Sequence, residues 1–166
     1  MAMSRSQPRA TSGRSLLALA IFGGLAAAAA IIGGLATASS TDSWYRRIEK
    51  PAWNPPDALF GPVWTALYAA VAVAAWLVWR RGGDRPEGKL STSLYVVQLG
   101  LNLLWSIIFF GLRAPGAALV EIVALWVAIF AWYKSAVPID SRVRWLILPY
   151  LAWVSFAATI NGGVWW

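Results

Sequence analysis

Long uncharged stretches recur five times along the chain, separated by polar segments. They cover residues 15–41, 58–79, 90–112, 114–133 and 145–166, and the fourth is interrupted only by Glu121. Each has about 20 residues or more, enough for a helix to cross roughly 30 Å of hydrocarbon. A membrane β-barrel would instead need short strands of alternating polarity. The pattern predicts an all-α membrane protein, a bundle of five transmembrane helices.

Breaks in the pattern predict the helix ends. We expect helices at about residues 15–37, 59–80, 93–112 and 114–134, and a fifth near the C-terminus. Asp57 is a candidate N-cap of the second helix, and GGDRPEG (82–88) is typical of a polar turn. Asp140 or Ser141 is expected to cap the fifth helix, which should bend at Pro149 because a mid-helix proline removes a ladder hydrogen bond.

The N-terminal segment allows several interpretations. Arginines before an apolar run that ends in Ala36-Thr37-Ala38 resemble a signal peptide, although the run is long for a signal core. Residues 1–14 are rich in Ser and Arg and lack acids, which leaves an organelle-targeting segment open. We favour a disordered tail (1–14) on a retained first helix, followed by one transmembrane domain (15–166).

Composition supports a membrane environment and narrows the chemistry. Of the 166 residues, 59% are hydrophobic and 13% charged, too few polar groups to cover a soluble domain. Cysteine and histidine are absent, and Met1 and Met3 are the only methionines. Disulfides, thiol nucleophiles, imidazole bases and the commonest zinc and haem-iron ligands are thereby excluded. We expect no metal site and no required cofactor.

The net charge of +7 is explained by membrane orientation rather than by nucleic acid. With five crossings, ten basic residues lie on the N-terminal side: Arg5, Arg9, Arg14, Arg80, Arg81, Arg85, Lys89, Lys134, Arg142 and Arg144. The other side carries four: Arg46, Arg47, Lys50 and Arg113. Because cytoplasmic loops are enriched in Lys and Arg, we expect the N-terminus in the cytoplasm.

The connector at about 38–58 is the one long loop, and loops of this length are often lids or binding loops. It contains the stretch KPAWNPP (50–56). Its prolines reduce the entropy lost on ordering, and tryptophan prefers a half-apolar surface. We expect a folded lid over the bundle mouth, stiffened by Pro51, Pro55 and Pro56, with Trp53 beneath it. A rigid turn that only joins two helices is the alternative.

Polar and aromatic residues at helical spacing predict which faces point inward. The stripes are Trp64 and Tyr68; Gln98, Asn102, Trp105 and Phe109; Glu121, Leu125, Ala128 and Trp132; and Tyr150, Trp153, Ala157 and Asn161. An amide exposed to lipid is costly, so we expect these stripes to converge on one cavity. Gln98 and Asn102 either contact a ligand or only join neighbouring helices. Glu121 is either functional or snorkels to, or pairs with, a basic group.

Several segments together resemble the translocator protein or tryptophan-rich sensory protein (TspO) family. They are WYRRIEKPAWNPP (44–56), GPVWTALY (61–68), QLGLNLLWSIIFFG (98–111) and LPYLAWVSFAATIN (148–161). The resemblance implies a five-helix membrane bundle, commonly a homodimer, that binds tetrapyrroles such as protoporphyrin IX or haem. It also implies synthetic isoquinoline and benzodiazepine ligands and, in some members, sterols. The chain ends NGGVWW, without the basic residue of the animal sterol-recognition segment.

The resemblance also implies a ligand site under the first loop. Its residues here are Tyr45, Trp53, Asn54, Pro55, Trp64, Tyr68, Asn102, Trp153 and Ala157. Trp64 and Trp153 match tryptophans implicated in light-dependent porphyrin breakdown in bacterial relatives. Trp105 shares the stripe of Asn102 and is included among the ligand contacts.

The residues themselves suit a flat, hydrophobic, anionic ligand. Indole rings at Trp53, Trp64 and Trp153 offer stacking surfaces, and three cations at the mouth, Arg46, Arg47 and Lys50, are expected to contact propionates. The expected partners are membrane lipid, a tetrapyrrole and a second copy of the chain. A transporter of porphyrins or sterols, and a sensor that signals through a partner, are the alternatives.

Overall fold

The structure is a computed structural model that describes residues 12–40 and 44–166. It contains five long helices: α1 (Ser12–Ser40), α2 (Phe60–Gly82), α3 (Pro86–Ser106), α4 (Pro115–Ala136) and α5 (Arg144–Trp165). Three short helical turns join them: η2 (Asp57–Leu59), the π-helical η3 (Ile107–Gly111) and η4 (Ser141–Val143). All five long segments are long and apolar enough to cross a membrane, which confirms the predicted all-α, five-helix membrane fold.

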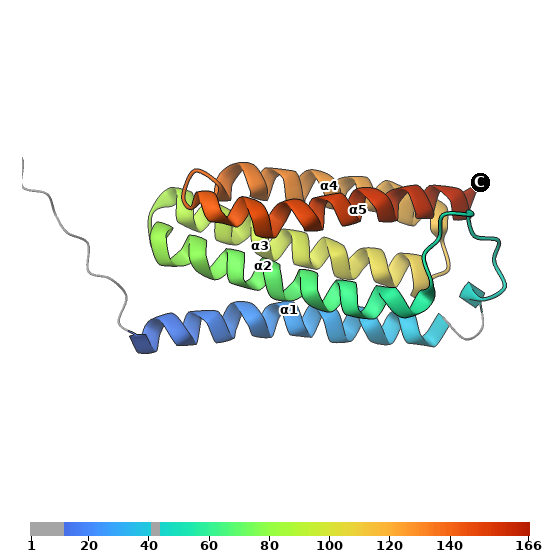
Figure 1. Cartoon of the computed structure of the whole chain (residues 1–166), viewed down its shortest axis with the longest axis horizontal. Helices are drawn as coiled ribbons and strands as arrows, with labels where there is room; N and C mark the ends of the chain where they lie inside the picture. The colour runs from blue at the N-terminus through green and yellow to red at the C-terminus, as the bar shows by residue number, and fades with distance from the viewer. Residues whose placement is uncertain (1–11, 41–43) are drawn as a thin grey trace, which may run out of the picture.

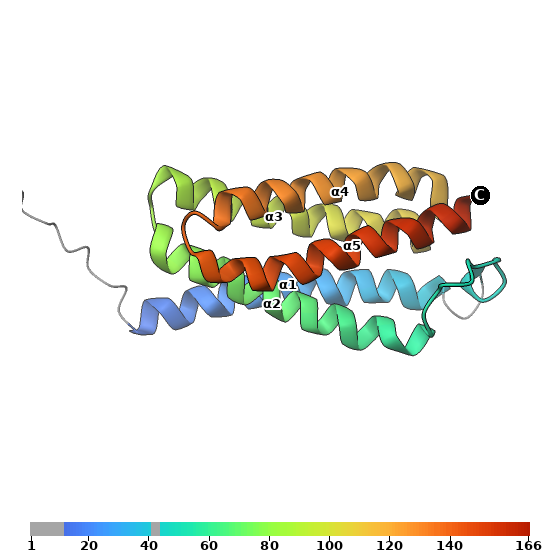
Figure 2. The ribbon, with the colours of Figure 1, turned by 45° about the horizontal axis from the view of Figure 1, so that its top comes forward.

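The helices lie side by side along one axis, as Figure 1 shows. α1 packs against α2 and α3, α4 packs against α3 and α5, and α2 contacts both α3 and α5. The view in Figure 2, turned by 45°, shows the same bundle with the α2–α3 and α4–α5 turns at one end. The C-terminus and the visible part of the α1–α2 connector lie at the other end.

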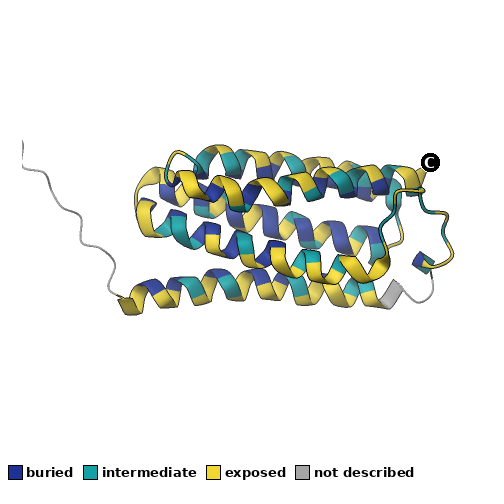
Figure 3. Cartoon of the chain, viewed as in Figure 1, coloured by how far each residue is buried: buried dark blue, intermediate teal, exposed yellow. Residues whose placement is uncertain are grey.

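A few polar side chains are buried among the apolar residues of the bundle core, and apolar side chains also cover its outside, as a lipid environment favours. Gln98, Asn102 and Asn161 are buried, whereas Val120 on α4 is 75% exposed. Figure 3 shows buried and exposed positions alternating in stripes along each helix. The predicted inward direction of the stripes is confirmed, since all of their members are buried except Trp64 and Trp153, which are half-buried. Their predicted convergence on one cavity was wrong for α4, because none of the residues of the α4 stripe lines the large cavity described below.

One predicted helix start and one predicted cap were wrong. α3 begins at Pro86 rather than near residue 93, because a proline at the first helical position has the right φ and lacks only an N–H that would be unpaired anyway. Gly82 and Gly88 allow the tight turn before it, since a Cβ on Gly82 would lie 2.8 Å from the Gly88 Cα. Asp57 does not cap α2 but opens η2, and its carboxylate lies 3.6 Å from Lys50 Nζ.

The predicted capping role of Asp140 is confirmed only for the short turn η4 that precedes α5, since the N-cap of α5 itself is Val143. The buried carboxylate of Asp140 accepts hydrogen bonds from the Arg142 backbone N–H at 3.1 Å and from Arg142 Nε and Nη2 at 3.0 and 2.8 Å. Arg81 Nε lies 3.2 Å from the same group. The α4–α5 turn is therefore joined to the end of α2 by one carboxylate.

Asp140 should make the stability of the fold depend on pH. The Arg142 hydrogen bond, followed by the nearby positive charges, lowers the pKa of Asp140. A depressed folded-state pKa contributes stability above the unfolded pKa of about 3.9, and this is lost as the pH falls through the folded-state pKa. We expect Asp140→Asn to lower the thermal midpoint at pH 7 by about 2–4 °C and to reduce the further loss below pH ~4. Thermal melts in detergent between pH 2 and 7 test this, and an unchanged acid limb would contradict it.

Candidate ligand cavity

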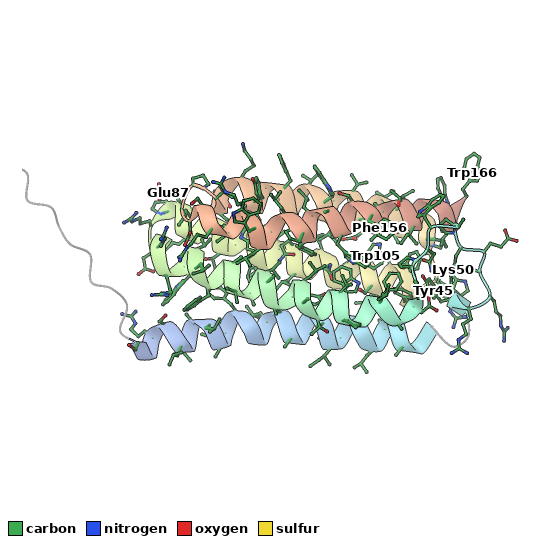
Figure 4. All side chains as sticks on the ribbon, viewed as in Figure 1. Tyr45, Lys50, Glu87, Trp105, Phe156 and Trp166 are labelled. Atoms are coloured by element: carbon green, nitrogen blue, oxygen red, sulfur yellow. The ribbon has the colours of Figure 1, made fainter. Side chains whose placement is uncertain are left out.

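A cavity of about 530 Å³ lies at the connector end of the bundle, between α1, α2, α3 and α5. Seven aromatic side chains line it: Tyr45, Phe60, Trp64, Tyr68, Trp105, Phe109 and Phe110. Figure 4 shows Tyr45, Lys50 and Trp105 toward this end, opposite Glu87. An apolar, aromatic hollow with few polar groups is typical of a small-molecule site.

The aromatic walls are packed ring against ring. Trp105 stacks on Phe109 with ring centroids 5.3 Å apart and an interplanar angle of 23°. On the facing helix, Trp64 lies 5.7 Å from Tyr68 at 35°. The π-helical turn η3 carries Phe109 and Phe110, and both rings make edge contacts with Tyr45 of the connector. These contacts fix flat surfaces around the hollow.

α1 contributes the small-residue wall of the cavity, with Ala30, Gly33, Gly34, Thr37 and Ala38. A Cβ at Gly33 would lie 3.2 Å from Ser106 Oγ, so α1 approaches α3 closely there. Gly34 and Ala38 on α1, and Gly61 and Thr65 on α2, line the cavity and are exposed. The cavity therefore opens on the outer surface of the bundle between α1 and α2.

A chain of hydrogen bonds forms the floor of the cavity. The Tyr68 hydroxyl donates to Asn102 Oδ1, and Asn102 Nδ2 donates to the Tyr150 hydroxyl at 3.0 Å. Tyr150 in turn donates to Gln98 Oε1 at 2.9 Å. The amides thus join α2, α3 and α5, which is one of the two roles that the sequence left open for them, and Asn102 also lines the cavity. Because the proton of Tyr68 is directed to Asn102, the Tyr68 oxygen faces the cavity chiefly as an acceptor.

A second polar pair, Trp105 and Asn161, joins helices beside the cavity. Trp105 Nε1 donates to Asn161 Oδ1 at 3.1 Å, and Asn161 Nδ2 donates to the Pro115 carbonyl at 2.7 Å. This pair links α3 and α5 to the first residue of α4. It also holds the Trp105 ring in the orientation in which it lines the cavity.

Two hydrogen bonds hold the described part of the connector together, and one contact joins it to α5. The Tyr45 hydroxyl donates to Asn54 Oδ1 at 3.2 Å, and Asn54 Nδ2 donates to the Pro55 carbonyl at 3.0 Å. Pro51 packs on α5, where a Cβ on Gly163 would lie 2.9 Å from the proline ring.

Burial, and then the charge of Asp57, raise the pKa of Tyr45 to about 12, so it is a neutral phenol at physiological pH.

The structure brings together only part of the site expected from the sequence. Tyr45, Trp64, Tyr68, Asn102, Trp105 and Ala157 line the cavity. Trp53, Asn54, Pro55 and Trp153 do not, and Trp53 is 56% exposed. Trp153 lies behind Trp64, with centroids 6.5 Å apart and planes at 89°.

The three expected propionate contacts also lie outside the cavity lining. Arg46 and Arg47 are exposed on the connector. Lys50 is closer to the mouth, because its Nζ lies 4.0 Å above the Tyr45 ring and 3.6 Å from Asp57, and both of these residues line the cavity. Lys50 is therefore the cation best placed to meet a ligand.

Several lining residues were missed. Phe60 and Phe110 lie in uniformly apolar segments, where no contrast between polar and apolar positions reveals the inward face. The α1 residues of the lining were missed for the same reason, and the clustering of Gly33 beside Gly34 was the one available signal for a thin wall.

The fold and the site define an integral multi-pass membrane protein with an aromatic cavity inside the bundle. A sequence profile described as the TspO/MBR family matches residues 22–166, and the chain belongs to this family. It is 41% identical over 124 residues to "Tryptophan-rich protein TspO" of Archaeoglobus fulgidus, covering 75% of this chain and 79% of that protein. It is 38% identical over 148 residues to the protein of the same name from Chlorobaculum tepidum, covering 89% and 94%.

A mammalian relative is equally similar. The chain is 41% identical over 127 residues to human "Translocator protein", covering 74% of this chain and 73% of that protein. Similarity thus extends to archaeal, bacterial and animal proteins that bear both family names. Each of these matches covers about three quarters of the chain or more.

Proposed function

We propose that the chain binds a tetrapyrrole of the protoporphyrin IX or haem type in the cavity between α1, α2, α3 and α5. The observation that carries the proposal is the lining: seven aromatic side chains around about 530 Å³. This volume lies within the range of roughly 300–1,000 Å³ of small-molecule sites. The opening between α1 and α2 supports a ligand that partitions into the membrane. The visible connector, packed against Gly163, is proposed as the lid of this site.

The binding experiment is a titration of the purified, detergent-solubilised protein with protoporphyrin IX in the dark, followed by tryptophan quenching. Saturable binding that is weakened by Trp64→Ala supports the proposal, because Trp64 lines the cavity. Absence of saturable binding would overturn it. Protein-dependent flux of porphyrin into vesicles, without any loss of the porphyrin, would favour the transporter alternative.

The charge at the mouth predicts how the acid groups of the ligand are recognised. Asp57 lines the cavity and forms an ion pair with Lys50. An anionic ligand is therefore attracted by Lys50 and repelled by Asp57. We expect Lys50→Gln to weaken protoporphyrin IX binding about fivefold, and Asp57→Asn to strengthen it by a similar factor. The dimethyl ester of protoporphyrin IX is the control ligand, because it keeps the ring and lacks the charges. Equal effects on acid and ester would contradict this role of Lys50.

We further propose that Trp64 and Trp153 support light-dependent degradation of the bound porphyrin. The first step transfers one electron from the Trp64 indole to the excited porphyrin, which leaves an indole radical cation and a porphyrin radical anion. Trp153 then donates an electron to Trp64, since their rings are neighbours at 6.5 Å. Dissolved dioxygen is the co-reactant: it adds to the porphyrin radical anion, the adduct returns one electron to the indole radical, and the ring-opened product keeps both oxygen atoms. Loss of the porphyrin absorption band under illumination is the measurement.

Orientation and assembly complete the proposal. The N-terminal end of α1 and the α2–α3 and α4–α5 turns are proposed to face the cytoplasm, and two copies are proposed to form a homodimer. Protease access in sealed vesicles tests the orientation, and the mass of the detergent complex tests the dimer. The predicted tail falls mostly on residues 1–11, outside the described residues.

A further inference from the structure

A second cavity, of about 410 Å³, lies at the end of the bundle opposite the aromatic one. It is enclosed by the α2–α3 turn and the end of α4, near Glu87 in Figure 4. Three basic side chains line it, Arg81, Arg85 and Lys134, with Glu87 as the one carboxylate. Leu90, Pro138 and Ile139 form an apolar part of the same lining. The cavity therefore combines excess positive charge with an apolar wall.

The frame around this cavity is held by backbone and ionic contacts. Gly82 and Gly88 are buried and nearly touch, which fixes the turn between α2 and α3. Asp140 joins Arg81 to the α4–α5 turn at 3.2 Å and also binds Arg142. The Asp140 carboxylate is thus already paired with Arg81 and Arg142. Lys134, at the end of α4, is exposed and has no ion-pair partner in the part of the chain that the structure describes.

The position of the cavity at the end of the spans identifies the class of ligand. Leu90 belongs to the membrane-spanning segment Pro86–Gly111 and is 57% exposed, so an acyl chain beside it would lie along α3. Basic pockets between the ends of transmembrane helices are suited to acidic lipid head groups. We propose that this cavity binds the phosphate of an anionic phospholipid, with Lys134 and Arg85 contacting the head group and Leu90 the acyl chain.

The test measures binding of phosphatidylglycerol and phosphatidylcholine to the full-length protein by native mass spectrometry from detergent. We expect phosphatidylglycerol to bind preferentially, and Lys134→Gln and Arg85→Gln each to weaken it about fivefold. Arg144→Gln and Arg80→Gln are matched controls, because each substitution removes one positive charge. Both residues are exposed at the same end of the bundle, and neither lines the cavity. The controls should change binding by less than about twofold.

Three results would overturn the proposal. Equal weakening by all four variants would show diffuse attraction to a basic surface rather than a site. Equal binding of the two lipids would remove the role of the negative charge. Glycerol phosphate binding as tightly as phosphatidylglycerol would assign the cavity to a free phosphate, since no acyl contact would then contribute.

Discussion

Replacing Trp64 by phenylalanine is expected to slow the light-dependent loss of bound protoporphyrin IX by roughly tenfold or more, which corresponds to ~1.4 kcal/mol in the barrier. Phenylalanine keeps an aromatic surface but is much harder to oxidise than indole. Binding in the dark should therefore change by less than about threefold. Tyr45 is a poorer donor than indole, because burial raises its pKa to about 12 and keeps it a phenol that must lose its proton when oxidised.

Trp153→Phe should produce a smaller loss of the same kind. Trp153 does not line the cavity, and Trp64 is the oxidisable lining residue whose ring it contacts. Trp126→Phe is the matched control, since Trp126 stacks on the exposed Phe130 and is not part of the cavity. Rates of bleaching under one lamp, normalised to bound porphyrin, make the comparison. Unchanged rates in both the Trp64 and Trp153 variants would remove electron donation by indole from the proposal.

The parts of the fold that follow from sequence are those with strong contrast between polar and apolar positions. Gln98 and Asn102 predicted the inward face of α3 because an amide in hydrocarbon needs a partner, and the structure supplies one for each through Tyr150. Asp140 predicted a cap because its short carboxylate reaches backbone N–H groups, and it accepts from Arg142 N. Both predictions follow from the chemistry of the side chain itself.

The parts that could not be predicted depend on tertiary contacts. Apart from Thr37, the α1 wall consists of glycine and alanine, which carry no polarity to show that α1 borders the cavity. The indole of Trp53 is suited to ligand stacking, yet the residue is 56% exposed. The reason is that the Pro51–Gly163 and Tyr45–Asn54 contacts determine how the loop turns. The start of α3 was hidden by a polar stretch that becomes helical once Pro86 occupies its first position.

Glu121→Met is expected to raise the thermal midpoint of the protein. Glu121 is 8% exposed on α4, and neither carboxyl oxygen has a hydrogen-bond partner among residues 12–40 and 44–166. Burying a polar group without a partner costs about 1–3 kcal/mol, and methionine fills a similar volume without that cost. The midpoint should rise by about 2–4 °C for each kcal/mol recovered in a chain of this size.

Glu121→Gln separates the two explanations that an intramembrane acid allows. If the unpaired carboxyl group of Glu121 only destabilises the fold, glutamine should recover less stability than methionine, because the glutamine amide would also be unpaired. Glu87→Gln, at an exposed position, should leave the midpoint unchanged. A fall in the midpoint of Glu121→Met, or loss of dark porphyrin binding, would instead mean that the carboxyl group is retained for function. Its neighbour Tyr150, whose hydroxyl donates to Gln98 and accepts from Asn102, would then be the first contact through which the acid acts on the cavity floor.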